Sequence, residues 1–300
     1  MINVILIVKG RERMECLQRM NDSLDYLEEN LCEEIDIEQV AKVACLSKFH
    51  FQRMFHILTD VTIAEYLRKR RLTLAAQELA TLDSKVIDVA LKYGYSTPES
   101  FSKAFKRLHG INPSQVRDSG VTLKAYPRFF FQIQLKGAER MNYKVIEREA
   151  FKIVGKAIRV STVDGENFKA IPEFWDECCS SGFYDQLTEK MGDLGVMGVC
   201  GVDCDGQKDE FTYMVAIEKP KDKLELDIVE REIPASTWAV FESIGPMPDA
   251  IQEVWKRIFA EWFPSTGYEH AGTPELEVYY PGNPDDADYK TEVWIPIIKK

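Results

Sequence analysis

The sequence of 300 residues has no apolar run long enough to cross a membrane. The apolar run from Ile2 to Val8 is seven residues, whereas a transmembrane helix needs about 20. Lys9, Gly10 and Arg11 follow it without a small-residue cleavage site, so we do not interpret it as a signal peptide. We expect a cytoplasmic protein that does not contact a membrane.

Cysteine and histidine patterns of a metal or redox site are also missing. The seven Cys include no Cys-x-x-Cys motif, and the four His are unclustered. The close pairs are Cys178 with Cys179 and Cys200 with Cys204. Free thiols in a reducing compartment explain this pattern better than a zinc or redox site. We therefore expect no metal and no cofactor.

Positive charge is scarce overall, with a net charge of −11, but it is unevenly distributed. Residues 39–125 contain 14 Lys and Arg against 7 Asp and Glu, a net of +7, whereas residues 126–300 contain 20 against 32, a net of −12. An overall acidic chain therefore contains a basic segment of the size of a small domain. Such a segment is typical of a nucleic-acid-binding domain joined to an acidic partner.

The basic segment contains the same short unit twice, at 41–56 and 90–106. With one residue inserted in the turn, Phe51 aligns with Phe101, Arg53 with Lys103 and Phe55 with Phe105. Each unit predicts a short helix, a tight turn and a second helix, the arrangement of a helix-turn-helix. Ser47 and Thr97 are the expected N-caps, with Pro98 at the first helical position.

The second helix of each unit can pack its two Phe side chains inward and present polar and basic side chains outward. The spacer from Thr62 to Leu82 has no Pro or Gly and predicts a helix of about 30 Å, close to one turn of DNA. The spacer contains the basic run Arg68-Lys69-Arg70-Arg71. For this run two interpretations stay open, a solvated helix face and a phosphate-contacting face.

Spaced fragments between about residues 17 and 117 resemble the AraC/XylS family of transcription regulators. They are Leu46-Ser47-Lys48-Phe49, Gln52-Arg53-Met54-Phe55 and Gly110-Ile111-Asn112-Pro113-Ser114. The resemblance implies an all-α domain with two helix-turn-helix units that binds double-stranded promoter DNA. It places base contacts on Phe49, Gln52 and Arg53, and on Glu99, Ser100 and Lys103. The full set of expected DNA-binding residues is Lys48, Phe49, His50, Gln52, Arg53, His56, Glu99, Ser100, Lys103, Lys106 and Arg107.

The second half of the chain also repeats. Residues 145–149 recur at 228–232, 170–175 at 250–255, and 213–217 at 293–297. Each half predicts a strand, a helix and two strands, so two β-α-β-β units related by a pseudo-two-fold axis form a sheet with helices on one face. In the last strand Val293, Ile295 and Ile297 alternate with Glu292, Trp294 and Pro296. If the aliphatic side chains pack on the helices, Glu292 and Trp294 share the opposite face, joined by Thr212 and Met214.

The stretch Glu292-Val293-Trp294-Ile295-Pro296-Ile297 and the tandem repeat resemble the GyrI-like effector-binding domain, over about residues 142–298. The resemblance implies an α+β fold with a pocket at Glu292 and aromatic neighbours, and it makes the whole chain similar to regulators of the Rob type. The expected ligand-binding residues are Glu292, Trp294, Thr212, Met214, Trp255, Tyr268 and Tyr280. Trp255 at helical spacing also fits a core position, and Tyr268 and Tyr280 fit either role.

The expected organisation is an AraC-type DNA-binding domain at 14–120, a linker at 121–141 and a GyrI-like domain at 142–300. We expect a transcription regulator, not an enzyme, controlled by a lipophilic cationic or aromatic small molecule. RNA polymerase is an expected partner. Two alternatives stay open for the second domain: a hydrolase of electrophilic compounds that uses Glu292 as acid or base, and a protein-docking module that uses its acidic surface.

Overall fold

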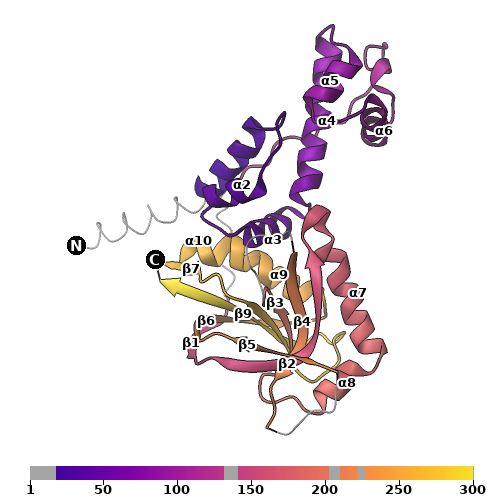
Figure 1. Cartoon of the computed structure of the whole chain (residues 1–300). Coiled ribbons are helices and arrows are strands. Elements are labelled where there is room, and N and C mark those ends of the chain that lie inside the picture. Colours follow the sequence, from indigo (N-terminus) through magenta and orange to yellow (C-terminus); the bar gives the residue numbers. More distant parts are fainter. Residues whose placement is uncertain (1–17, 132–140, 203–209, 222–226, 300) are drawn as a thin grey trace, which may run out of the picture. The chain divides into compact units, whose positions relative to one another are not determined.

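The computed structural model of the chain describes residues 18–131, 141–202, 210–221 and 227–299 (Figure 1). The chain divides into two compact units. Of the described residues, 18–131 belong to one of them and 141–299 to the other. The expected linker therefore begins too early, because its described part, residues 121–131, belongs to the first unit. Residues 132–140 of that linker lie outside the described residues.

The first unit is entirely helical, as expected. A helix described over residues 18–29 precedes two helix-turn-helix pairs. The first pair is α2 (Ile37–Val43) with α3 (Lys48–Thr59), and the second is α5 (Val86–Lys92) with α6 (Pro98–His109), followed by the 3-10 turn η1 (Pro113–Gln115). The Ser47 hydroxyl accepts a hydrogen bond from the His50 N–H, and the Thr97 hydroxyl accepts one from the Ser100 N–H, which confirms both predicted N-caps.

The turns of the two pairs share one geometry. Cys45 and Gly94 follow the ends of α2 and α5 in the left-handed conformation, with φ of 58° and 80°. The next N–H donates to a carbonyl five residues earlier in each case, from Leu46 to the Ala41 carbonyl at 2.9 Å and from Tyr95 to the Ala90 carbonyl at 3.0 Å. This is the Schellman arrangement, which ends a helix sharply. The predicted insertion of one residue lies after this point, between Tyr95 and Thr97.

Helix α4 (Ile63–Thr81) joins the pairs and is 19 residues long, or about 28 Å at 1.5 Å per residue. Each pair packs on its own end of α4: Phe55 lies against Tyr66 with ring centroids 5.7 Å apart, and Phe101 and Phe105 share a core cluster with Leu72 and others from the second half of α4. The spacer is thus part of both cores.

Arg70 and Arg71 of the basic run on α4 make contacts within their own unit. For these two residues the structure therefore argues against a role in phosphate contact. The Arg70 guanidinium donates to both carboxylate oxygens of Glu28, from Nε at 2.8 Å and Nη2 at 2.7 Å. Arg71 donates to the carbonyls of Leu31 at 2.7 Å and Glu33 at 2.8 Å. These arginines hold the first helix of the unit on α4.

The second unit is an antiparallel sheet with helices, as the α+β prediction required. Its strands are β1 (Tyr143–Arg148), β2 (Phe151–Ser161), β3 (Val196–Cys200), β4 (Glu210–Glu218), β5 (Val229–Ile233), β6 (Ser236–Ile244), β7 (Tyr268–His270), β8 (Glu275–Tyr279) and β9 (Lys290–Lys299). Its helices are η2 (Val163–Gly165), α7 (Asn167–Ser180), α8 (Phe183–Thr188), α9 (Asp249–Arg257), the π-helix η3 (Ile258–Trp262) and α10 (Phe263–Ser265).

The strand order β1-β6-β9-β8-β3-β4-β2-β5 has the predicted pseudo-two-fold symmetry, with its axis between β8 and β3. The first half has one strand more than predicted and the second has two, because β1 and β5 precede β2 and β6, and β7 precedes β8. The repeat at 145–149 and 228–232 lies in these short outer strands, and the longer strands that follow it were not recognised. β1 pairs with β6 and β2 with β5, so each half exchanges a strand with the other.

The sheet curves strongly. β1 begins the strand order and β2 lies next to its far end, yet only Glu149 and Ala150 separate them along the chain. The two ends of the sheet must therefore approach each other. Arg148 at the end of β1 confirms this, because it bonds Glu218 of β4 at 2.7 Å and lies 4.1 Å from the ring centre of Phe151. The sheet face without helices thus becomes a closed core.

Of the described helices, none is long and apolar enough to cross a membrane.

The Glu28 contacts predict a pH-dependent contribution to stability. Burial alone would raise the pKa of the Glu28 carboxyl, but the hydrogen bonds from Arg70 and Tyr66 outweigh it and hold that pKa below its usual 4.5. A lowered carboxyl pKa stabilises the fold above the unfolded-state pKa, and this stabilisation is lost as the pH falls through the folded-state pKa. We expect Glu28→Gln to lower the free energy of unfolding by about 1–3 kcal/mol at neutral pH and by much less near pH 3.

Urea unfolding at both pH values measures this difference. Glu29→Gln, at the exposed neighbouring position, is the matched control and should change little. An equal loss at both pH values would show that the pair does not act through the Glu28 charge.

Candidate functional site

Helix α6 presents one solvent-exposed polar face. Phe101, Phe105 and His109 are buried at 0%, 0% and 5% exposure, so the opposite side points outward. All five predicted residues of this reader are exposed, namely Glu99, Ser100, Lys103, Lys106 and Arg107. A helix with three cations and two hydrogen-bonding side chains on its open face can contact phosphates and base edges together.

On α3, five of the predicted residues lie on one side of the helix by their spacing. They are Lys48, Phe49, Gln52, Arg53 and His56. Phe51, Met54 and Phe55 face the core of this unit. His50 differs from its predicted role, because its Nδ1 lies 2.7 Å from the hydroxyl of Ser47 and its ring contacts Phe49 edge-on at 5.4 Å. Its ring is therefore engaged with the helix start rather than aligned with the reading side.

Glu292 lies on the sheet face opposite the helices, where the register predicted it. It is 4% exposed, and its Oε2 accepts hydrogen bonds from Trp294 Nε1 at 2.9 Å and Tyr280 Oη at 3.0 Å. Its Oε1 lies 3.5 Å from Lys144 Nζ and 3.8 Å from Lys290 Nζ. The burial and the nearby carboxylate raise the pKa of the Tyr280 phenol. Lys144 thus forms an ion pair with this carboxylate, and Lys290 lies near it while it bonds Glu242 at 2.9 Å.

Thr212 and Met214 share that face, as predicted. Trp294 and Met214 belong to one cross-strand row through Leu276 and Val199. Thr212 lies beyond that row on the side away from Glu292, and it accepts a hydrogen bond from Arg159 at 3.2 Å. β9 and β4 are three strand spacings apart, or about 14 Å. Thr212 and Glu292 therefore cannot contact the same functional group.

Trp255 and Tyr268 do not join this group. Trp255, 1% exposed, donates from Nε1 to Glu277 Oε1 at 2.7 Å on the helix side of the sheet. Tyr268 stacks on Trp262, with ring centroids 5.6 Å apart, and Trp262 packs on Phe241, whose side chain is also on the helix side. The face they were expected to share is closed by the curved ends of the sheet.

A second carboxylate lies on the helix side, at the centre of the sheet. Glu277 of β8 is half-buried, and Tyr279 Oη donates to its Oε2 at 2.8 Å. The Tyr279 ring contacts Trp175 of α7 edge-on at 4.9 Å, and Trp175 Nε1 donates to Tyr213 Oη at 2.7 Å. Burial, then the Glu277 charge, raises the pKa of Tyr279 well above its usual value.

We call Glu277, Tyr279, Tyr213, Trp175 and Trp255 the Glu277 cluster. It connects α7 to α9 across β8, β3 and β4. Gly198 makes room for it, because a Cβ atom there would lie 2.4 Å from Tyr213 Oη. A carboxylate among indoles and phenols is suited to charge pairing and cation-π contact with an organic cation.

Comparison with known proteins agrees with this geometry. A model of the family described as integron-associated effector binding protein matches residues 144–297, and a helix-turn-helix domain model matches residues 40–119. The regulatory protein SoxS of Escherichia coli (strain K12) is 37% identical over 98 residues, which are 33% of this chain and 92% of SoxS. The HTH-type transcriptional activator AarP of Providencia stuartii is 38% identical over 98 residues, 33% of this chain and 73% of AarP.

The chain belongs to the AraC family of DNA-binding transcription regulators. Its second unit belongs to the family of integron-associated effector binding proteins and has the GyrI-like fold. Among solved structures, SAV2435 bound to tetraphenylphosphonium is similar over 53% of this chain and 94% of its own, with 23% identity and a TM-score of 0.46.

The sequence of this AraC-family chain contains a signal for Glu277 in the alternation of its strand. Along 275–279, Leu276 and Val278 alternate with Glu277 and Tyr279. The same register argument that placed Glu292 away from the helices places Glu277 beneath them. A carboxylate on a helix-covered face needs specific partners, and that requirement marks Glu277 as a site candidate.

For the AraC-family reader, we expect Lys103→Ala to weaken binding to a selected operator by about 1–3 kcal/mol. Lys42→Ala is the matched control, because Lys42 of α2 is already paired with Glu38 at 2.9 Å and should lose little affinity. Fluorescence anisotropy with labelled duplexes at several salt concentrations measures both variants. Equal losses for the two variants would indicate a non-specific effect of charge and contradict a role for α6 in reading.

Proposed function

We propose that the C-terminal domain binds a lipophilic organic cation at the Glu277 cluster and that this binding controls transcription from the promoter that the AraC-type domain recognises. The observation that carries the proposal is a half-buried carboxylate whose two oxygens are oriented by an indole and a phenol, at 2.7 Å and 2.8 Å. The two donors are an indole N–H and a phenol O–H, and together they fix the direction of both carboxylate oxygens of Glu277. Cation-π contacts with the surrounding rings add about 1–2 kcal/mol when they are desolvated.

Glu292 is less suited to a cationic effector. Lys144 and Lys290 lie within 4 Å of it, so an organic cation would have to displace an ammonium group. Its low exposure also leaves no approach among the described residues. We assign Glu292 a structural role, in which it orients Trp294 and Tyr280 inside the closed core.

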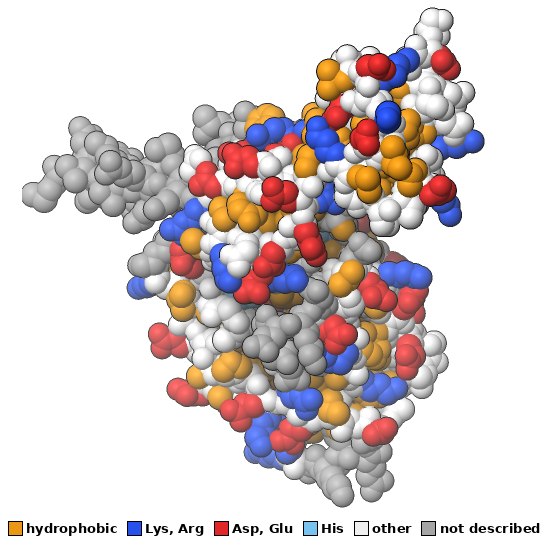
Figure 2. Space-filling view, turned by 45° about the horizontal axis from the view of Figure 1, so that its top comes forward, with side chains coloured by type: hydrophobic (Ala, Val, Ile, Leu, Met, Phe, Trp, Pro, Cys, Tyr) orange, Lys and Arg blue, Asp and Glu red, His pale blue; other side chains and the backbone are white. Residues whose placement is uncertain are grey.

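The hydrolase alternative loses its main support for the same reason. Glu292 was its expected acid or base, but a carboxylate bonded to Tyr280 and Trp294 and paired with Lys144 is poorly placed to activate water. The docking alternative uses the acidic surface of the second domain. On the face of the C-terminal unit seen in Figure 2, acidic side chains alternate with basic ones instead.

Titration of the intrinsic Trp fluorescence with tetraphenylphosphonium tests the proposal, because Trp175 and Trp255 belong to the cluster. We expect saturable quenching by the cation and at least tenfold weaker binding in Glu277→Gln, since the amide keeps the shape and removes the charge. The neutral triphenylphosphine oxide should bind both proteins similarly.

Glu292→Gln is the matched control and should leave the affinity for tetraphenylphosphonium unchanged. If Glu292→Gln abolishes binding and Glu277→Gln does not, the site lies on the other sheet face. If neither variant changes the affinity for tetraphenylphosphonium, the proposal that a carboxylate of this domain recognises the cation is wrong.

The route from effector to transcription is tested separately. Effector control through the readers changes the affinity for operator DNA, because a ligand shifts an equilibrium only by its different affinity for two states. Control through contact with RNA polymerase changes transcription in a purified system at constant operator affinity. Measuring both quantities with and without tetraphenylphosphonium distinguishes the two routes.

A further inference from the structure

The segment that follows the second helix-turn-helix pair is bound to both recognition helices. We call residues 121–131 the strap. It was expected to be a free linker, but it contacts α6 near its start, α4 in its middle and α3 near its end. The three contacts involve different residues and different kinds of interaction.

At the second reader, the Lys124 N–H donates to His109 Nδ1 at 3.2 Å. His109 is the last residue of α6, and its Nε2 lies 3.2 Å from the Leu72 carbonyl of α4. Leu123 packs against the core cluster that contains Phe101 and Phe105. The start of the strap is thus anchored to the C-terminal end of the second recognition helix.

In the middle, the strap lies on α4. The Tyr126 N–H donates to Thr73 Oγ1 at 3.1 Å, and the Tyr126 carbonyl accepts from Arg70 Nη1 at 2.6 Å. Lys69 Nζ lies 5.1 Å from the centre of the Tyr126 ring. Arg70 therefore bonds Glu28 and the strap with the same guanidinium.

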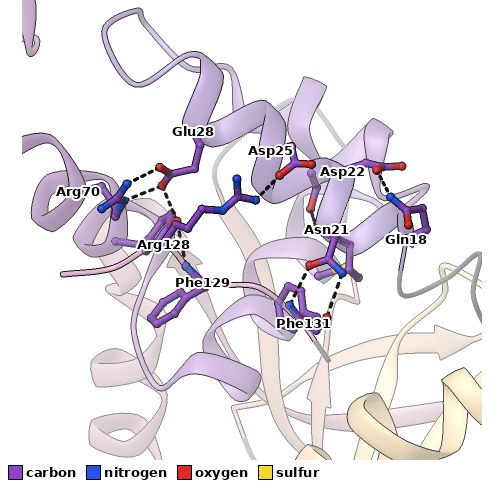
Figure 3. Close-up of polar contacts among 12 residues, drawn as sticks. Gln18, Asn21, Asp22, Asp25, Glu28, Arg70, Arg128, Phe129 and Phe131 are labelled. Carbon is purple, nitrogen blue, oxygen red and sulfur yellow. Dashed lines mark hydrogen bonds and ion pairs between the residues drawn. The ribbon is translucent and has the colours of Figure 1, made fainter. Parts of the chain in front are cut away.

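At the first reader, Phe129 stacks on Tyr66, with centroids 4.9 Å apart and planes 16° apart, and lies 6.2 Å from the ring of Phe55 in α3. Asn21 bonds the Phe131 backbone twice, to the N–H at 2.8 Å and to the carbonyl at 3.0 Å, and Arg128 forms an ion pair with Asp25 (Figure 3). The end of the strap thus fixes the first helix and the first recognition helix together.

The lengths of the two parallel paths agree. From Tyr126 to Phe129 the strap advances three residues, or about 10 Å when extended. Their partners on α4, Thr73 and Tyr66, are seven residues apart, or about 10 Å along a helix. The strap therefore lies taut along α4 and can resist bending between the two readers.

We propose that the strap is a positioning element that fixes the separation and orientation of α3 relative to α6, and so restricts the chain to operators whose two contacted segments have one spacing. A single helix of about 28 Å would allow the readers to bend and twist relative to each other. A second connection that is bonded at both ends removes that freedom. The proposal rests on DNA reading by α3 and α6, and it is independent of the effector site.

The test compares full-length proteins on duplexes of altered spacing. Duplexes are recovered from a random library with the unmodified protein, their two contacted segments are located by footprinting, and one or two base pairs are inserted or deleted between them. We expect the unmodified protein to lose affinity steeply with each change in spacing. In Phe129→Ala the ratio between the optimal and altered duplexes should fall about fivefold or more, because the strap no longer holds α3.

Phe130→Ala is the matched control, since Phe130 is the neighbouring residue of the same type and is 61% exposed. It should keep the spacing profile of the unmodified protein. Asn21→Ala, which removes both bonds to Phe131, is the second variant, with Gln18→Ala on the same helix as its control. Circular dichroism and thermal unfolding show which variants are folded. If Phe129→Ala does not fold, Asn21→Ala still tests whether the strap positions the readers.

Unchanged spacing profiles in folded Phe129→Ala and Asn21→Ala would overturn the proposal, as would equal broadening in Phe130→Ala. Failure of the unmodified protein to select any duplex would instead contradict DNA reading itself. A variant that binds every spacing equally more weakly would show that the strap supports folding without positioning the readers.

Discussion

The bidentate pair between Arg70 and Glu28 joins three parts of the DNA-binding unit. The pair holds the first helix on α4, and the remaining Arg70 donor holds the strap through the Tyr126 carbonyl. Burying two charges costs desolvation free energy, which their attraction offsets only when the geometry of the pair is good. Removing one partner would leave the other charge buried and uncompensated. Both side chains are only 11% exposed, and Tyr66 supplies a further donor at 2.6 Å. One guanidinium thus helps to hold both the first helix and the strap in place on α4.

Charge counting alone misassigns the function of the basic residues on α4. Residues 39–125 have a net charge of +7, and it is natural to assign such an excess to phosphate binding. Arg70 and Arg71, however, are directed to a carboxylate and to backbone carbonyls within their own unit. A guanidinium can donate to several acceptors at once in a fixed plane, so an arginine can equally well hold helices of its own domain together. The cations Lys103, Lys106 and Arg107, in contrast, are exposed on the open face of α6.

Local signals predicted the helical unit well, because each decisive feature there is short in range. Caps, helical periodicity and turn length lie within about 20 residues, and the helix boundaries followed them closely. The site in the second unit depended on which sheet face is closed. Strand alternation placed Glu292 on the face away from the helices, but it does not say that β1 and β2 meet around this face. That outcome depends on strand exchange between the halves, which pairs residues 74 to 98 positions apart in the sequence and is not visible in the alternation of side chains along one strand.

The duplicated halves differ at the point where the candidate site lies. Trp175 and Trp255 occupy equivalent positions on α7 and α9, and each indole N–H donates to the sheet at 2.7 Å. One indole meets the phenol of Tyr213 and the other meets the carboxylate of Glu277. Two equivalent donors therefore orient one neutral and one charged acceptor, and Tyr279 connects them through its ring and hydroxyl. A symmetric sheet would place the same group on both sides of its axis, so this asymmetry puts one carboxylate at one end of the aromatic cluster, and the proposed cation site rests on that difference.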